Sequence, residues 1–399
     1  MNILLLTNDI DGPGVGYDVK FSRELLDKAC KVTVFHNGHR EDVKNRIYKF
    51  SNKNFFTFFH KFKKLYKKEQ IDIAHVRGVI SFQHIIWFVC LISLRAKYVI
   101  STNSQLLKYN LNNKIFFENP DFRNKISDNK KLFSTKLSIN NLLSKFIPLL
   151  KKIYLLLLGN FFIIKSKGLI FFSKYEQVNS KKIDIINTVI YEPNLINTKF
   201  QLLGNSKFKY NFEDINIVYW GRLDYYLKGI DRIIYLAKEI KSIDKNNVIK
   251  FHLMGPDYNN SLKKIISEIN KHDLNNKIIY HTREIWINNL QPFVSADYSI
   301  LLSRWDGFPR SLRESIFYNI PIIASKETNF GDIINKTDCG YLIDFKKSEN
   351  FLKFIKELIY NKKEIIDNQK KNCEKAKYFL SEEFYKNSII TFYKKIIIN

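Results

Sequence analysis

The sequence predicts an α/β protein built from two doubly wound parallel sheets. Short apolar strands, glycine-containing loops and helices alternate from Asn2 onward. The same alternation starts again near Ile215, after a linker opened by Glu192-Pro193-Asn194. The length of 399 residues, with 45% apolar content, suits two or three domains that each have a full core.

The first strand and its loop predict the carboxyl edge of the N-terminal sheet. The expected strand, loop, helix and strand cover residues 2–7, 8–16, 17–29 and 32–36. The loop sequence GPGVG departs from the dinucleotide-binding fingerprint, because its third glycine falls one position early and Gly12 is followed by Pro13. Asp9 and Asp11 form an Asp-x-Asp pair, but such a pair is too common by chance to predict a metal site. We interpret the loop as a flexible lip.

Two apolar stretches, residues 79–94 and 153–164, resemble membrane spans but are shorter than the roughly 20 residues that a bilayer core requires. Each therefore predicts a buried helix of the first domain. A strand over residues 169–172 closes that domain, and a final helix is expected over residues 383–397. Residues 109–150 are rich in Lys and Asn, with scattered Phe, and predict an insertion.

The strand over residues 217–220 leads into a loop with two cations and then into a helix that runs through Lys238. Glycines in this loop allow the backbone to approach a ligand closely. Arg222 offers a planar fork to phosphate oxygens, and Lys228 offers a point charge. Either residue alone would be an ordinary surface cation in so basic a chain.

A second strand, over residues 298–302, leads through a turn into a helix over residues 311–318. Ligands of open α/β sheets bind at this edge, and the first N–H groups of a helix suit a diphosphate. Asp306 in the loop and Glu314 in the helix are placed to accept hydrogen bonds from sugar and ribose hydroxyls. The alternative is that both are solvated acids of an ordinary βα unit.

Both segments resemble elements of the family 4 retaining glycosyltransferases, also called group 1, which have the GT-B fold. GRLDYYLKGID is similar to their G-R-L-(5)-K-G-x-D element, and Asp306-x7-Glu314 to their E-x7-E element. PIIASKETNFGDIINKTDCGYLI extends the similarity downstream. The resemblance implies two Rossmann-like domains facing each other across a cleft, over residues 1–190 and 191–380, with a helix at 381–399 that crosses back to the first domain.

The resemblance also implies the reaction and its residues. A sugar would pass from a nucleoside diphosphate sugar to a lipid-linked or polysaccharide acceptor with retention, in bacterial surface polysaccharide biosynthesis, as in lipopolysaccharide or capsule. The enzyme would be of hexosyltransferase type, and no metal or other cofactor would be required. The implied catalytic residues are Arg222, Lys228, Asp306 and Glu314. The implied donor-binding residues are Gly14, Val15, Gly16, Asn103, Gly307, Phe308, Arg310, Ser311 and Leu312, and the acceptor-side residues are Asp11 and His75.

Two departures from the family pattern bear on the donor. Asn103 stands where many relatives have a histidine that contacts the transferred sugar, and it can donate a hydrogen bond but cannot carry a proton. Asp306 is one methylene shorter than the usual glutamate. His75, in IDIAHVRG, is an acceptor-side residue by resemblance. The alternative is that it is a structural histidine at a strand end, bonded to the backbone.

Charge and cysteine usage bear on compartment and partners. The net charge is +26, and residues 1–200 carry 33 Lys and Arg against 15 Asp and Glu. The cysteines at 30, 90, 339 and 373 lack zinc-ligand spacing and predict free thiols in a reducing compartment. The start MNILLLTND lacks the features of a signal peptide. A cytoplasmic protein, peripheral on the inner face of the membrane, is expected, and no nucleic-acid-binding motif is found.

Residues 55–68 form a basic aromatic segment with two interpretations. Phe55, Phe59, Phe62 and Tyr66 recur at helical spacing, and lysines occupy most positions off that stripe. Such a helix could lie on an anionic membrane. Alternatively, the stripe faces the core and the lysines are solvated.

Two rival functions remain. A sugar-nucleotide epimerase of the same fold would need acid and base residues instead of an acceptor cleft. The second rival is a catalytically inactive, basic relative that binds a membrane or nucleic acid. The intact pair Arg222 and Lys228 argues against it.

Overall fold

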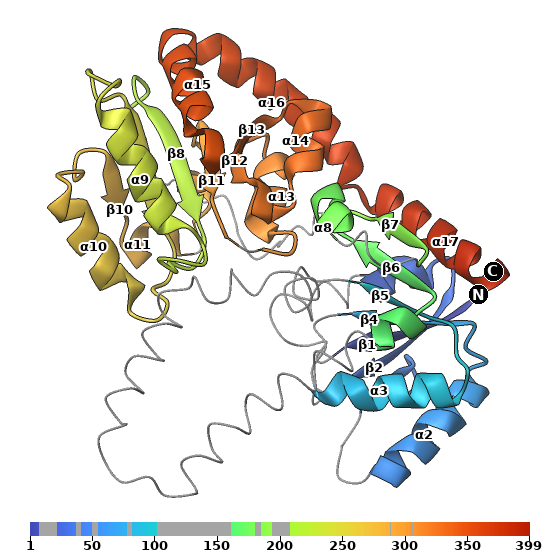
Figure 1. The fold of residues 1–399 in the computed structure, drawn as a ribbon. Helices are drawn as coiled ribbons and strands as arrows, with labels where there is room; N and C mark the ends of the chain where they lie inside the picture. The colour runs from blue at the N-terminus through green and yellow to red at the C-terminus, as the bar shows by residue number, and fades with distance from the viewer. Residues whose placement is uncertain are drawn as a thin grey trace, which may run out of the picture. The chain divides into compact units, whose positions relative to one another are not determined.

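A computed structural model describes two units of the chain (Figure 1). The residues described are 1–7, 22–36, 41–49, 55–77, 82–101, 161–179, 185–193, 208–287, 289–304 and 306–399. Unit 1 comprises Met1–Phe172, Glu176–Ile190 and Lys386–Asn399. Unit 2 comprises Ser173–Tyr175 and Tyr191–Tyr385.

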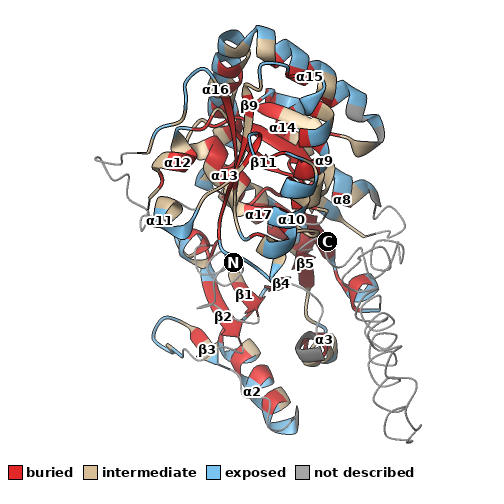
Figure 2. Cartoon of the chain, turned by 90° about the vertical axis from the view of Figure 1, so that its left-hand side faces the viewer, coloured by how far each residue is buried: buried red, intermediate tan, exposed pale blue. Residues whose placement is uncertain are grey.

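Unit 1 contains a seven-stranded parallel sheet in the order β3-β2-β1-β4-β5-β6-β7. Its strands are short and mostly apolar, as expected for a parallel sheet covered on both faces. Figure 2 shows strands β1, β2, β4 and β5 of this sheet as largely buried. The strands are β1 (Asn2–Thr7), β2 (Lys31–His36), β3 (Ile47–Lys49), β4 (Ile73–Arg77), β5 (Tyr98–Ser101), β6 (Gly168–Phe171) and β7 (Asn187–Val189).

Helices cover both faces of this sheet. Helices α2 (Phe55–Lys68) and α3 (Phe82–Ser93) share one apolar cluster with the side chains of Leu4, Leu6 and Val76. Alternate side chains of β4 point to opposite faces of the sheet, and His75 points away from α2 and α3. On that second face it meets Tyr393 of α17 (Glu382–Ile398). A Cβ atom on Gly168 would lie 2.7 Å from Cζ of the Phe392 ring, so a larger residue there would force this ring of α17 to shift. The short helix α8 (Lys174–Asn179) lies between β6 and β7 in the chain.

Helix α2 turns its aromatic side inward. Phe62 is 1% exposed, and Phe59 and Tyr66 are partly buried against the same core. The side chain of Phe55 lies outside the described residues. The lysines are exposed, at positions 61, 63, 64, 67 and 68. The interpretation that the aromatic stripe lies on a membrane is therefore wrong, because the stripe is used to cover the sheet.

The predicted buried helix over residues 79–94 is confirmed as α3, in which Trp87, Phe88, Cys90 and Leu91 are buried. Of the stretch 153–164, residues 161–164 are described; they are helical, and Phe162 and Ile163 are buried. Within the described part of the chain, none of the helices combines the length and apolar content that a membrane crossing needs.

Unit 2 contains a six-stranded parallel sheet in the order β10-β9-β8-β11-β12-β13. The first three strands run in order from β8 at the centre to β10 at one edge. The chain then returns to β11, beside β8, and the remaining strands run to β13 at the other edge. In register, Ile217 of β8 pairs with Tyr298 of β11. The strands are β8 (Ile215–Trp220), β9 (Ile249–Met254), β10 (Ile278–Tyr280), β11 (Tyr298–Leu301), β12 (Ile322–Ser325) and β13 (Gly340–Ile343).

The connections of this sheet place helices on both of its faces, because the direction of winding reverses at β11. Helices α9 and α10 contact one another, and α15 contacts α9; α13 and α14 contact α16. The helices are α9 (Ile230–Lys241), α10 (Ser261–Lys271), α11 (Arg283–Trp286), α12 (Gln291–Val294), α13 (Arg310–Phe317), α14 (Gly331–Thr337), α15 (Ser348–Tyr360) and α16 (Lys362–Phe379).

Candidate functional site

The candidate site lies at the carboxyl ends of β8 and β11. These strands are neighbours, and the chain winds away from them in opposite directions. Such a reversal is the place where open α/β sheets bind ligands, because the two following loops diverge there. The two segments that sequence analysis singled out follow these two strands.

Glycines fix the course of the loop after β8. Gly229 has a φ of 72°, and a Cβ atom there would lie 2.0 Å from the carbonyl oxygen of Leu302, at the end of β11. A Cβ atom on Gly255 would lie 1.8 Å from the carbonyl oxygen of Gly221, so the loop after β9 is equally close on the other side. Backbone hydrogen bonds join these loops, from Leu223 N to Pro256 O at 2.8 Å. The close approach of Gly229 brings Lys228 to the loop after β11.

Lys228 and Asp306 form an ion pair across the two segments. The ammonium Nζ donates to the Asp306 carboxylate, which also accepts a hydrogen bond from Ser303 Oγ at 3.2 Å. The Lys228 side chain is 22% exposed and the Asp306 side chain 17%, so the ion pair is partly buried and remains accessible to solvent. The structure thus brings together two of the four predicted catalytic residues.

Arg222 is exposed and lies over the ring of Tyr258, with its guanidinium carbon 4.1 Å from the ring centroid. This cation–π contact holds the guanidinium over the ring, and the side chain stays exposed to solvent. The backbone carbonyl of Arg222 accepts a hydrogen bond from Tyr219 Oη at 2.6 Å. Tyr258 follows β9 and was not predicted; its only sequence signal is an aromatic residue in a turn.

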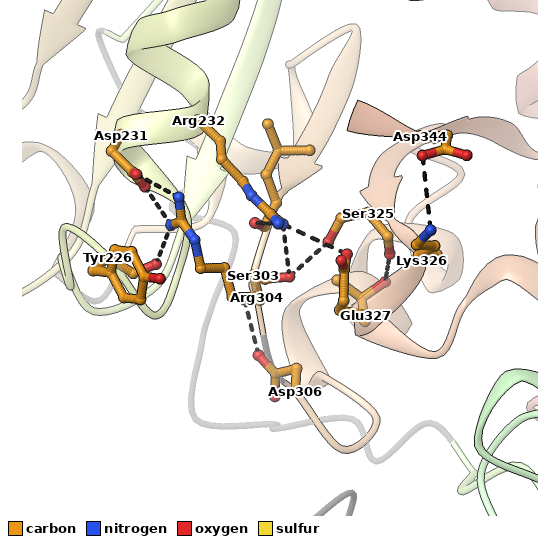
Figure 3. A network of polar contacts seen from close by, with 12 residues as sticks. Tyr226, Asp231, Arg232, Ser303, Arg304, Asp306, Ser325, Lys326, Glu327 and Asp344 are labelled. Atoms are coloured by element: carbon orange, nitrogen blue, oxygen red, sulfur yellow. Dashed lines mark hydrogen bonds and ion pairs between the residues drawn. The ribbon is translucent and has the colours of Figure 1, made fainter. Parts of the chain in front are cut away.

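Two further arginines hold the segments together, as Figure 3 shows. Arg304 donates to both carboxylate oxygens of Asp231, at 2.7 and 2.6 Å, and to the carbonyl of Tyr226 at 2.7 Å. Arg232 donates to the carbonyls of Leu302 and Ser303, at 3.0 and 3.4 Å. Burial lowers the pKa of Arg232, although Glu327 beside it opposes the shift. These are positioning contacts that sequence reasoning missed.

Helix α13 presents Glu314 one turn after its first residue, Arg310. Pro309 precedes the helix and makes no side-chain hydrogen bond to its first turn. Burial raises the pKa of Glu314 to about 7, against the opposing charges of Arg310 and Arg313. This carboxyl group changes its protonation near neutral pH.

Arg313 fastens α13 from its buried side. It is 2% exposed and donates to the carbonyl of Pro193 at 2.6 Å, with Glu192 Oε2 at 3.8 Å. The predicted linker residues Glu192 and Pro193 are therefore partners of the site helix. The sequence offered no signal for this contact, since 120 residues separate Arg313 from Pro193.

The structure restricts two predicted donor contacts to the main chain. The ring of Phe308 is buried and stacks on Phe330, with centroids 4.3 Å apart, so its side chain is a packing element. The side chain of Leu312 is 0% exposed. Gly307 offers a carbonyl that already accepts a hydrogen bond from Asn329 at 2.6 Å.

His75 lies in the middle of the buried strand β4 in unit 1. His75 is 2% exposed, and its Nδ1 is 2.6 Å from the hydroxyl of Tyr393 in α17. Burial, with the nearby charge of Arg77, holds the pKa of His75 well below its usual value. The structure favours the alternative of a packed, neutral histidine over the predicted acceptor contact. The hydrogen-bond partner of this histidine is the Tyr393 hydroxyl and not a backbone group.

The remaining predicted site residues, Asp11, Gly14, Val15, Gly16 and Asn103, lie outside the described residues, as do Asp9 and the insertion at 109–150. Among the residues that are described, no group of three or more His, Cys, Asp or Glu side chains has the arrangement of a metal site.

A protein-family model matches unit 2, and solved structures match both units. Residues 205–378, all within unit 2, match the family model described as glycosyl transferases group 1. No curated protein matches the chain.

Solved structures match along the whole chain. They include a glycosyltransferase from Rickettsia africae, with 16% identity, a TM-score of 0.65, and coverage of 100% of this chain and 99% of that chain. HepE from Anabaena in complex with UDP has 14% identity, a TM-score of 0.62, and coverage of 99% and 100%. The lipopolysaccharide outer core galactosyltransferase WaaB has 14% identity, a TM-score of 0.60, and coverage of 98% and 99%. The chain therefore has the GT-B fold, with one parallel sheet of Rossmann type in each unit.

Proposed function

We propose that the protein is a glycosyltransferase that takes a sugar from a nucleoside diphosphate sugar. The observation that carries the proposal is the ion pair of Lys228 and Asp306 where β8 and β11 diverge. A cation for a phosphate and a carboxylate for sugar hydroxyls meet at the edge of the sheet where ligands bind. The group 1 family match over residues 205–378 supports the same activity.

The proposed chemistry is stabilisation of the leaving diphosphate. Negative charge develops on the bridging phosphate oxygen as the glycosidic bond breaks. Arg222, Lys228 and the first amides of α13 supply fixed positive potential for that charge. Lys228 would exchange part of its contact with Asp306 for the phosphate, which leaves the carboxylate available to the sugar.

Hydroxyl recognition falls to the two carboxyl groups. Glu314 is proposed to accept hydrogen bonds from the ribose and Asp306 from the transferred sugar. We further propose that transfer proceeds with retention, that the donor phosphate assists the incoming hydroxyl on the same face, and that no metal is required. The two cations and the helix start already provide the charge that a metal would supply.

The acceptor is proposed to be lipid-linked or a polysaccharide, in bacterial surface polysaccharide assembly at the cytoplasmic face of the membrane, with the enzyme of hexosyltransferase type. Two similar structures support this direction, because HepE is solved with UDP-glucose and WaaB is a lipopolysaccharide galactosyltransferase. Five exposed lysines along α2 suit an anionic surface, although its aromatic stripe is turned inward.

A donor screen tests the proposal. Purified protein is incubated with a panel of nucleoside diphosphate sugars, and release of nucleoside diphosphate is measured with and without acceptor extracts. We expect release with one donor class. It should be severely lowered in Lys228→Ala and retained in Lys238→Ala, whose lysine is exposed on α9 away from the loop. Conversion of the donor sugar without transfer of radiolabel to an acceptor would instead identify an epimerase. Absence of release and of donor binding across the panel would indicate an inactive relative.

A further inference from the structure

Asn329 holds the loop that carries Asp306. It follows the short helix η2 (Lys326–Thr328), has a left-handed backbone with φ of 66°, and is 2% exposed. Its Nδ2 donates to the carbonyl oxygens of Asp306 and Gly307, at 3.1 and 2.6 Å. Its Oδ1 accepts a hydrogen bond from Ser173 Oγ at 2.6 Å.

The three contacts fix which way the amide points. Backbone carbonyls only accept, so the nitrogen must face Asp306 and Gly307, and the oxygen then faces the hydroxyl of Ser173. A carboxylate of the same shape would have no proton to offer the two carbonyls. The left-handed backbone suits asparagine or glycine, but only asparagine also supplies the amide.

The backbone of Asp306 is therefore held at both of its polar groups. Its N–H donates to the carbonyl of Glu327 at 3.2 Å, and its C=O accepts from Asn329. Both partners lie in the segment after β12, whose strand pairs with β11. With the main chain fixed, the carboxylate reaches Lys228 and Ser303.

We propose that Asn329 is a positioning residue that sets the place of the Asp306 carboxylate in the donor site. The inference rests on the proposed function only for the role of Asp306 toward the sugar. Binding groups must be held within about 0.5 Å of productive geometry, which a loop achieves through hydrogen bonds to its main chain. Asn329 supplies two such bonds from one buried side chain.

The first test needs no ligand. Asn329→Gly keeps the left-handed backbone and removes the amide. Asn247→Gly is the matched control, because Asn247 also has a positive φ, of 52°, and donates from Nδ2 to a carbonyl, that of Asn276 at 3.3 Å. Hydrogen exchange followed by mass spectrometry should show at least about tenfold faster exchange of amides 306–308 in Asn329→Gly and no change there in Asn247→Gly. Unchanged exchange at 306–308 would overturn the proposal, whether or not the protein transfers sugar.

The second test separates positioning from general stability. Binding of UDP-glucose and of UDP is measured by calorimetry in wild type, Asn329→Gly, Asn329→Asp, Asp306→Ala and the double mutant of Asn329→Gly with Asp306→Ala. We expect Asn329→Gly and Asn329→Asp to weaken UDP-glucose by about tenfold and UDP by less than about twofold. In the Asp306→Ala background, Asn329→Gly should add no further loss.

Equal weakening of both ligands, or an additive double mutant, would refute the role of Asn329. Wild type that binds neither ligand would count against UDP-glucose as donor, and the hydrogen exchange result would then decide the positioning role alone.

Discussion

Arg304 and Asp231 are joined by two parallel hydrogen bonds, at 2.7 and 2.6 Å, that tie the end of β11 to the start of α9. The guanidinium also lies 3.8 Å from the centroid of the Tyr226 ring. A bidentate pair of this kind constrains direction as well as distance. The loop with Lys228 and the loop with Asp306 are therefore tied together through Arg304.

The Arg304 pair should contribute to both stability and site geometry. Because both side chains are about 20% exposed, we expect Arg304→Ala and Asp231→Ala each to lower the free energy of unfolding by roughly 1 to 2 kcal/mol. Chemical denaturation of both single mutants and the double mutant gives the coupling energy. Strict additivity would show that the two side chains act separately.

Arg222→Ala and Lys228→Ala should each lower turnover severely while the thermal melt stays close to wild type. Loss of a charge-assisted hydrogen bond is worth roughly 1.5 to 3 kcal/mol, or about 10 to 150-fold, and more where charge develops in the transition state. Steady-state release of nucleoside diphosphate measures the effect. Near-wild-type turnover in both variants would contradict the site assignment.

Glu314 should make stability depend on pH. Its pKa of about 7 in the folded protein exceeds the usual 4.5, so between these values the folded state binds more protons than the unfolded state. The contribution of this group to stability therefore falls as pH rises from about 4.5 to 7. Glu314→Gln should be more stable than wild type at pH 8 by roughly 1 to 3 kcal/mol, with little difference at pH 4.5. Melting curves across this range decide, and equal stability at pH 8 would count against the shift.

The two carboxyl groups should differ toward ligands. Glu314→Ala should weaken binding of the free nucleoside diphosphate, because it removes the proposed ribose contact, whereas Asp306→Ala should act mainly on the sugar. Calorimetry with and without the sugar separates them. If Asp306→Ala weakens the sugar-free ligand more than Glu314→Ala does, the roles are reversed.

Phe62 should be essential to unit 1, and Phe56 dispensable. Both lie on α2, but Phe62 is 1% exposed and Phe56 is 79% exposed. Phe62→Asp places a charge in the core and should cost at least about 3 kcal/mol, whereas Phe56→Asp should stay within about 0.5 kcal/mol of wild type. Circular dichroism melts of the two variants provide the comparison. Detachment from vesicles without loss of stability in Phe62→Asp would restore the membrane interpretation.

Strand and helix positions in both units followed closely from the hydrophobic pattern. The predicted strands at 2–7 and 298–302 appear as Asn2–Thr7 and Tyr298–Leu301, and the helix expected from residue 311 begins at Arg310. Runs of buried apolar residues bounded by glycine and proline are local signals, so one segment suffices to read them. The aromatic stripe of α2 was ambiguous because a core and a membrane demand the same periodicity.

The supporting contacts of the site did not follow from the sequence. Arg304, Arg313 and Asn329 act on partners 73, 120 and 156 residues away, namely Asp231, Pro193 and Ser173. Nothing in the neighbouring residues distinguishes an arginine that pairs across two loops from a solvated one. The folded sheet, which sets β8 beside β11, brings Arg304 to Asp231. Arg313 and Asn329 meet residues that precede this sheet in the chain.

The last helix has a consequence for how the chain is made. Residues Lys386–Asn399 belong to unit 1, where Phe392 fills the space left by Gly168 and Tyr393 meets His75. A ribosome delivers these residues only after all of unit 2 has been synthesised. The sheet of unit 1 therefore lacks its contacts with α17 until unit 2 has been made. A premature stop codon just before Phe392 would damage the packing of unit 1, although every strand of its sheet had already been synthesised.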